Sequence, residues 1–181
     1  MQQFLINSFI LISLIMSNQT KPIFSFSSDA SLNRWQVIND GVMGGLSKSS
    51  LSVTDDGHGQ FSGHVSLANN GGFASARLLT DVKCKPDKQN IVLKIKGDGK
   101  TYQFRLKNNT DQQESYIQEF KTNGEWQTIK LKISEFSPQF RGKALDLPNF
   151  NFSKIEEVRF LIANKKEEDF ELLIDEISLT K

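Results

Sequence analysis

The glycine-rich segment WQVINDGVMGGLSKSS, residues 35–50, is the first candidate for chemistry in this chain. Glycine-rich loops bind phosphates when they join a strand to a helix, because the helix N-terminus then faces the anion. Here Gly44-Gly45 leads into LSKSSLSVTDDG, an alternating run rich in Ser, Thr and Val that predicts a strand. The order of the glycines also departs from the dinucleotide fingerprint, and no Walker lysine follows them. The segment therefore predicts no nucleotide site.

A role in loop geometry explains these glycines better. Gly41, Gly44 and Gly45 permit positive φ and close backbone approach, as a bulged loop between two strands requires. Val42 and Met43 lie among them, where a loop is ordinarily polar. Two interpretations stay open: the apolar pair closes the end of the fold, or it presents an apolar surface to a partner.

Hydrolytic catalysis is hard to assemble from the remaining side chains. The spacing of His58 and His64 matches no helical metal pair, and no serine lies in a G-x-S-x-G elbow. The single cysteine, Cys84, excludes an internal disulfide and a multi-cysteine metal site. These side chains therefore suggest no hydrolytic site. Asp29 and Asp175 are weak candidates for a Ca²⁺ site with loop oxygens, since Asp175 interrupts the last apolar run.

Arginine is scarcer than lysine, so each arginine is a candidate for a specific contact. Arg77 and Arg105 lie on expected strands, and on a shared sheet face they would suit a carboxylate or a polar ligand. The alternative is that they form structural ion pairs with Asp40 and Glu119. The overall charge is balanced, with 22 basic and 21 acidic residues, and gives no reason to expect nucleic acid or an anionic membrane as a partner.

These residues must be positioned mainly by strands, because apolar residues alternate with polar ones over most of the chain after residue 22. Gly97-Asp98-Gly99 predicts a hairpin, and KKEED at 165–169 predicts a solvated hairpin tip. Short helical turns are expected at 134–136 and 153–156. About ten strands with one apolar face each predict an all-β protein built as a two-sheet antiparallel β-sandwich.

The first sixteen residues differ from the rest. Residues 1–16 form an apolar leader or reflect a misassigned start, and 23–181 form a single β-sandwich domain. The apolar run is too short for a membrane span of about 20 residues but fits the apolar region of a secretory signal. Export is slightly favoured over a cytoplasmic protein starting at Met16, and no Arg-rich amphipathic segment indicates mitochondrial targeting.

Several segments give the chain a resemblance to the complex I intermediate-associated protein 30 family. The matching segments are WQVINDGVMGGLS (35–47), FSGHVSLANNGGFASAR (61–77), KIKGDGKTYQFRL (94–106), EFKTNGEWQTIKL (119–131), EFSPQFRGKAL (135–145) and VRFLIANKKEEDFELLIDEISL (158–179). The resemblance implies a galactose-binding-domain-like β-sandwich, or jelly roll. It also implies that the protein is not an enzyme, and we expect no catalytic residues and no cofactor. Mitochondrial members of the family act as assembly factors for the respiratory NADH:ubiquinone oxidoreductase.

We therefore expect a protein-binding, chaperone-like assembly factor whose partner is another protein, such as a respiratory-complex subunit or assembly intermediate. Loops that converge at one end of a sandwich make that end the natural site. The candidate partner-binding residues are Asp40, Val42, Met43, Phe73, Arg77, Arg105 and Arg141. The candidate structural loop residues are Trp35, Gly41, Gly44, Gly45, Asn70, Gly71, Gly72 and Trp126. A membrane contact is expected only indirectly or through the leader.

The alternative function is a carbohydrate-binding module, which the implied fold permits. Such a module needs exposed aromatic rings on which sugars stack. Tyr116, Phe150 and Phe152 are the candidates, and the supply is small because the chain has 14 Phe but two Tyr and two Trp.

Overall fold

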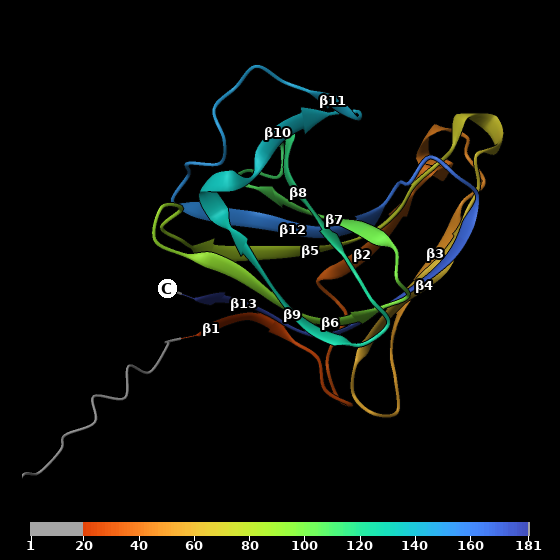
Figure 1. The fold of residues 1–181 in the computed structure, drawn as a ribbon, viewed down its shortest axis with the longest axis horizontal. Helices are drawn as coiled ribbons and strands as arrows, with labels where there is room; N and C mark the ends of the chain where they lie inside the picture. Colours follow the sequence, from red (N-terminus) through yellow and green to blue (C-terminus); the bar gives the residue numbers. More distant parts are fainter. Residues whose placement is uncertain (1–19, 181) are drawn as a thin grey trace, which may run out of the picture.

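The computed structural model describes residues 20–180 as two antiparallel β-sheets packed face to face (Figure 1). The six-stranded sheet has the order β3-β4-β13-β6-β9, and β1 pairs with the far end of β13. The seven-stranded sheet has the order β11-β10-β8-β7-β12-β5-β2. The predicted all-β, two-sheet antiparallel sandwich is therefore confirmed. The expected leader at 1–16 lies outside the described residues.

The strands and short 3-10 helices (η) follow one another along the chain. Their bounds are β1 Lys21–Ser25, β2 Trp35–Asn39, η1 Asp40–Met43, β3 Lys48–Val53, β4 Gly59–Val65, η2 Ala68–Asn70, β5 Ala74–Lys83, β6 Asn90–Gly97, β7 Thr101–Lys107, β8 Ser115–Lys121, β9 Trp126–Lys132, η3 Ile133–Glu135, β10 Ser137–Phe140, β11 Lys143–Ala144, β12 Lys154–Ile162 and β13 Glu168–Thr180. The helical turn expected at 134–136 is confirmed as η3. The turn expected at 153–156 is wrong, because β12 begins at Lys154 and continues β-bridge pairing from there.

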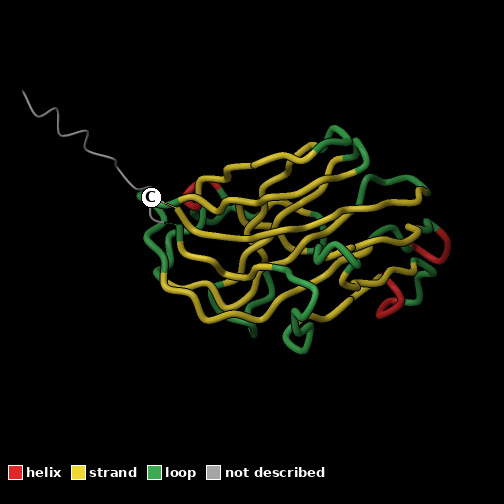
Figure 2. Tube along the Cα trace, turned by 90° about the horizontal axis from the view of Figure 1, so that it is seen from below, coloured by secondary structure: helices red, strands yellow, loops and turns green. Residues whose placement is uncertain are grey.

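The core lies between the two sheets and consists of the alternate residues of each strand. In β7, for example, Tyr102, Phe104 and Leu106 are fully buried and the residues between them are half-buried. Phe104 packs edge-to-face on Phe160 of β12, with ring centroids 4.9 Å apart. The period-two pattern thus marks the inward side of each strand, and Figure 2 shows the two resulting layers of strands.

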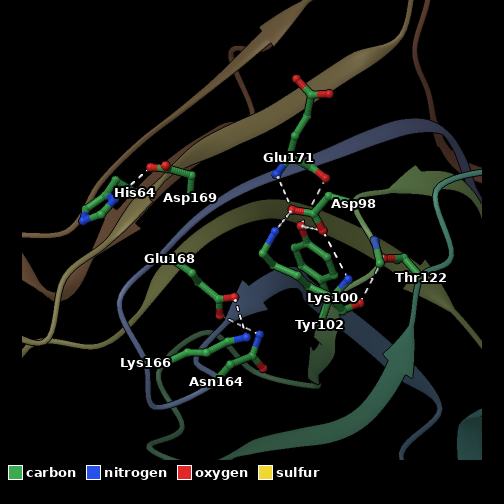
Figure 3. A network of polar contacts seen from close by, with 11 residues as sticks. His64, Asp98, Lys100, Tyr102, Thr122, Asn164, Lys166, Glu168, Asp169 and Glu171 are labelled. Carbon is green, nitrogen blue, oxygen red and sulfur yellow. Dashed lines mark hydrogen bonds and ion pairs between the residues drawn. The ribbon is translucent and has the colours of Figure 1, made fainter.

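Two expected hairpins are instead connections between the sheets. Gly97-Asp98-Gly99 follows β6 of the six-stranded sheet and leads into β7 of the seven-stranded sheet. Asp98 holds this connection in place (Figure 3), because its carboxylate accepts hydrogen bonds from Lys100 Nζ at 2.6 Å, from the Tyr102 hydroxyl at 3.0 Å and from the Glu171 backbone at 3.0 Å. The KKEED segment likewise joins β12 to β13 in different sheets, so it is no hairpin tip. Alternation persists in both cases because each strand still has one face on the shared core.

Within residues 20–180, no helix is long and apolar enough to cross a membrane.

Candidate functional site

The candidate site is one end of the sandwich, where the β2–β3 and β4–β5 connections meet. Figure 2 shows η1 and η2 at the same end of the molecule, away from η3. We call residues 40–47 and 66–73 the loop end. Ser47 and Ser66 join its two halves, because the Ser66 backbone N–H donates to Ser47 Oγ at 2.9 Å. The expectation that these two motif-bearing segments meet is therefore confirmed.

Asp40 is the centre of the loop end and is fully buried, with 0% of its surface exposed. Its carboxylate accepts hydrogen bonds from the backbone N–H of Ser47 at 2.9 Å, of Gly72 at 2.6 Å and of Phe73 at 3.2 Å, and a further one from the Ser47 hydroxyl. Burial by itself raises the pKa of Asp40, but these hydrogen bonds outweigh that effect and hold the pKa below its usual value. Asp40 therefore fixes the loops and offers no surface to a partner directly.

The glycines around Asp40 have a steric reason to be glycine. A Cβ on Gly45 would lie 2.4 Å from Asp40 Cγ, and one on Gly71 would lie 2.7 Å from Asp40 Oδ2. Gly44 ends η1 with φ of 92°, in the left-handed region that favours glycine. A Cβ on Gly41, by contrast, would meet nothing within 4 Å. The loop glycines thus make room for a buried carboxylate, which no pattern of glycine spacing could reveal.

Apolar side chains cover the outside of the same loops. Val42 is 73% exposed and Met43 is 61% exposed, so the interpretation that they close the end of the sandwich is wrong. Leu46 and Leu67, which are 55% and 44% exposed, are the chain neighbours of the bonded pair Ser47 and Ser66. The loop end therefore combines a polar, fully hydrogen-bonded interior with an apolar exterior.

Other predicted residues lie elsewhere. Trp35 is a core residue, 5.5 Å from the ring of Phe24. Trp126 begins β9 at the edge of the six-stranded sheet opposite β3, with its ring 4.6 Å from that of His58. Arg141 lies in the β10–β11 turn, at the edge of the seven-stranded sheet opposite β2. Phe73 is half-buried at the loop end, and Asn70 adopts a left-handed φ of 60° there.

Arg77 and Arg105 share the outer face of the seven-stranded sheet, as expected, but their partners differ from the expected ones. Arg77 Nη1 lies 3.5 Å from Glu157 Oε2, and Arg105 donates to Gln103 Oε1 at 3.0 Å and 2.6 Å. Ion pairs with Asp40 and Glu119 are therefore wrong, because Asp40 is enclosed by backbone donors and Glu119 contacts Gln103 at 3.0 Å.

The weak calcium candidates do not form a ligand cluster. The two carboxylate oxygens of Asp175 lie 3.1 Å from His58 Nδ1 and 2.7 Å from Lys94 Nζ. Asp29 accepts a hydrogen bond from Ser27 at 2.7 Å. Across residues 20–180, no group of three or more His, Cys, Asp or Glu side chains is placed to hold a metal ion.

The expected sugar-stacking rings are internal. Tyr116, Phe150 and Phe152 pack edge-to-face on one another with centroids 5.2–5.7 Å apart, and Tyr116 and Phe150 belong to the core. The prediction of an aromatic platform at these three residues is therefore wrong. In the described part of the chain, Trp126 is the only exposed aromatic side chain.

The sequence-based prediction missed several residues that complete these sites. Ser47 and Leu46 follow directly on the glycine motif, so their position in the chain was a usable signal. Ser66 and Leu67 carried no such signal, because only the folded loops bring them to Ser47. Glu157 was also missed, and Arg159 was singled out only as one of the few arginines, since the register of β12 is not readable from alternation alone.

Comparison with known proteins is consistent with this fold. Residues 24–174 match the family model described as complex I intermediate-associated protein 30. The mitochondrial protein of that name from Mus musculus is 22% identical over 91% of this chain, which spans 57% of the mouse protein's length.

Solved structures with the same fold include carbohydrate-binding modules. A family 11 module from Clostridium thermocellum, in complex with a β-1,3-1,4-mixed-linked tetrasaccharide, aligns with a TM-score of 0.66 and 19% identity over 88% of this chain and 94% of that chain. An exo-β-agarase aligns with a TM-score of 0.58 and 10% identity over 87% of this chain and 25% of that chain. The galactose-binding-like sandwich is thereby confirmed as the fold.

Proposed function

Because the chain belongs to the complex I intermediate-associated protein 30 family, we propose that it is a non-enzymatic factor that binds another polypeptide at the loop end. The observation that carries the proposal is the exposure of Val42 and Met43 on loops fixed from inside by Asp40. Exposed apolar side chains rimmed by polar residues mark protein-interaction sites more often than isolated surface residues do.

The rigidity of the loop end supports this proposal physically. Binding is weakened when loops must become ordered on contact, and loops that are already fixed avoid that cost. Asp40 ties η1 to the β4–β5 connection through backbone groups, so the apolar side chains are presented on a preformed surface. Met43 adds an unbranched, polarizable side chain that adapts to irregular partner surfaces.

The identity of the polypeptide is the finer part of the proposal. We propose an assembly intermediate or subunit of a respiratory complex as the partner, in line with the family description and the mouse relative's name. This chain spans 57% of the mouse relative's length. The proposal therefore concerns only the partner contacts that the matched part of that relative would make.

Charged substitutions on the apolar surface test the proposal. Affinity purification from native cells would compare the wild type with Val42→Asp and Met43→Asp, and Leu147→Asp is the matched control. Leu147 is also an exposed apolar residue, but it lies in the β11–β12 connection. We expect the two loop-end variants to lose at least tenfold of the recovered partner while the control retains it.

Circular dichroism and thermal melting of each variant separate binding from folding, because surface substitutions usually change stability by no more than about 0.5 kcal/mol. Recovery of the same partners at wild-type levels by folded Met43→Asp protein would rule out the loop end as the docking surface. N-terminal sequencing of the recovered protein would also determine whether residues 1–16 are removed.

A carbohydrate-binding module is the second candidate, favoured by the solved neighbour that holds a tetrasaccharide. Burial of Tyr116 and Phe150 weighs against it, because sugar stacking needs exposed rings. Trp126 is the remaining candidate for a stacking platform. A glycan array with no binding, or binding unchanged by Trp126→Ala, would remove that form of the hypothesis.

A further inference from the structure

Three arginines stand side by side on the outer face of the seven-stranded sheet. In β12, Arg159 is directly opposite Arg77 of β5 and also directly opposite Arg105 of β7. Figure 1 shows β7, β12 and β5 as neighbouring strands. We call Arg77, Arg159 and Arg105 the arginine row. Neighbouring strands are about 4.8 Å apart, so the row extends for about 10 Å across the sheet.

Like charges directly opposite each other on neighbouring strands destabilise a sheet, so the row needs compensation. One carboxylate provides part of it. Glu157, only 2% exposed, accepts hydrogen bonds from Arg159 at 3.0 Å and 2.7 Å through Oε1, and Arg77 lies 3.5 Å from Oε2. This single negative charge is shared by two guanidinium groups.

Arg105 lacks even that partner. Within residues 20–180 it forms no ion pair, and its guanidinium donates to the neutral amide oxygen of Gln103. Lys107, further along β7, adds another positive charge, and its ammonium donates to the Gln112 carbonyl at 2.6 Å. Two further acids lie nearby: Glu114 interacts electrostatically with Lys107, and the exposed Glu119 contacts Gln103 at 3.0 Å. The face therefore carries more positive than negative charge.

The surroundings of the row strengthen its attraction for an anion. Arg105 is directly opposite Ile117, a buried residue outside the main core, so this part of the face is partly shielded from water. Burial, together with the charge of Arg159, lowers the pKa of Arg105 to about 10, and burial also lowers the pKa of Lys107. Both groups stay cationic at neutral pH but are poorly solvated, and an incoming carboxylate would relieve this.

We propose that the arginine row binds the side-chain carboxylates of an acidic peptide segment. The inference rests on the proposed function, since that segment would belong to the polypeptide held at the loop end. Guanidinium groups form forked hydrogen bonds with planar carboxylates, and Arg105 has no carboxylate to occupy it within the described residues.

Position favours a peptide over an acidic glycan. Phe73 of the loop end is followed by β5, and Arg77 comes four residues later, about 13 Å along an extended strand. A polypeptide that covers Val42 and Met43 and continues over the sheet would therefore reach the row. The outward residues of β7 and β12 beside the row include no aromatic ring on which a sugar could stack.

The test uses the full chain and a synthetic octaglutamate peptide, with a polyglutamine peptide of the same length as the neutral control. Binding would be measured by isothermal titration calorimetry at two salt concentrations. We expect octaglutamate to bind and polyglutamine not to bind. Arg105→Gln should weaken octaglutamate binding at least tenfold, and Arg105→Lys should weaken it less. Arg34→Gln, which removes the same charge from an exposed position in the β1–β2 connection, should change it less than twofold. Higher salt should weaken binding to the wild type more than to Arg105→Gln.

Three results would overturn the proposal. Octaglutamate could fail to bind, its binding could fall equally in Arg105→Gln and Arg34→Gln, or polygalacturonate could bind through Arg105 while octaglutamate does not. The last result would replace the acidic peptide with an acidic glycan. Met43→Asp should bind octaglutamate like the wild type, so loss of native partners by that variant tests the loop end separately. Failure of either proposal is then visible without the other.

Discussion

The loop end and the arginine row are both built around a buried carboxylate, but the two carboxylates have opposite surroundings. Asp40 is surrounded by backbone N–H groups and a serine hydroxyl, all of them neutral. Glu157 lies among cationic side chains, with Arg159 and Arg77 both in contact. One site therefore contains a net negative group stabilised by dipoles, and the other contains a surplus of positive charge.

The difference indicates what each region can do. Neutral donors satisfy Asp40 completely, so its charge is used to fix two loops, and the surface above them is free to be apolar. Glu157 cannot neutralise every cation around it, so the surface of the sheet stays attractive to anions. A buried acid can thus either complete a local structure or leave a charged surface, depending on whether its partners are dipoles or ions.

Asp40→Asn should give the largest effect, because it replaces an acceptor-only carboxylate with an amide that directs N–H groups at backbone donors. Stranding several buried donors should lower the free energy of unfolding by about 3 to 5 kcal/mol. Chemical denaturation at neutral pH would measure it. A loss below about 1 kcal/mol, which is ordinary for a single hydrogen bond, would show that Asp40 does not hold the loops together.

The pH dependence of stability, measured for the wild type and for Asp40→Asn, gives a second test. The pKa of Asp40 is lowered in the fold, so its stabilisation is complete above the unfolded value of about 3.9 and is lost as the pH falls through the folded pKa. The stability difference between wild type and Asp40→Asn should therefore be constant near neutral pH and should shrink below about pH 4. If the stability difference between the two proteins stayed constant into strong acid, the Asp40 carboxylate would not be ionised in the folded protein.

Glu157→Gln should destabilise the protein less than Asp40→Asn does, and it should strengthen the binding of octaglutamate. It leaves the arginine row without a carboxylate, and we expect a loss of about 2 kcal/mol, reduced by the solvent that reaches both arginines. Because the positive charge of the face rises, octaglutamate should bind severalfold more tightly to the variant than to the wild type.

Glu119→Gln is the matched control, since Glu119 is an exposed acid on the same face. It should alter stability by less than about 0.5 kcal/mol. If Glu157→Gln weakened octaglutamate binding in a folded protein, the acidic peptide would not be recognised by surplus charge, and the contrast between the two regions would fail.

Gly45→Ala tests the space around Asp40 and should affect stability about as much as Glu157→Gln. Its methyl group would overlap Asp40, so the loops must shift at a cost of about 1 to 3 kcal/mol. Gly41→Ala adds the same methyl group where nothing lies within 4 Å and serves as the control. Thermal melting compares the two variants directly, and equal melting temperatures would show that the space around Asp40 is not restrictive.

Alternation alone was enough to predict most strands, but it could not assign their partners. The runs that became β6 and β7 were expected to pair across Gly97-Asp98-Gly99, and they lie in different sheets. A strand alternates in the same way whether its neighbour is in its own sheet or in the opposite one, because both sheets face the same core. The hydrogen bond that the Glu171 backbone N–H donates to Asp98, which helps to stabilise the crossing, joins residues that no local pattern connects.

For the candidate sites as well, the local sequence predicted some features and long-range contacts decided the others. Local chain order was sufficient to single out Asp40, Val42 and Met43, because an acid and two apolar residues among glycines are unusual within one short loop. The sequence could not show that Asp40 points inward and its neighbours outward, since that depends on backbone donors more than twenty residues away at Gly72 and Phe73.

By itself, then, the sequence determined the all-β class, the apolar alternation and the family of this chain, because these depend on short-range periodicity and contiguous motifs. Only the tertiary structure decided the strand order, the burial of Asp40 and the arginine row. The arginines of the row are far apart in the chain: 28 residues (105 − 77) separate Arg77 from Arg105, and 54 residues (159 − 105) separate Arg105 from Arg159. Only strand register places them side by side. Long-range pairing sets which charges share a surface, and here it also sets where a partner is expected to bind.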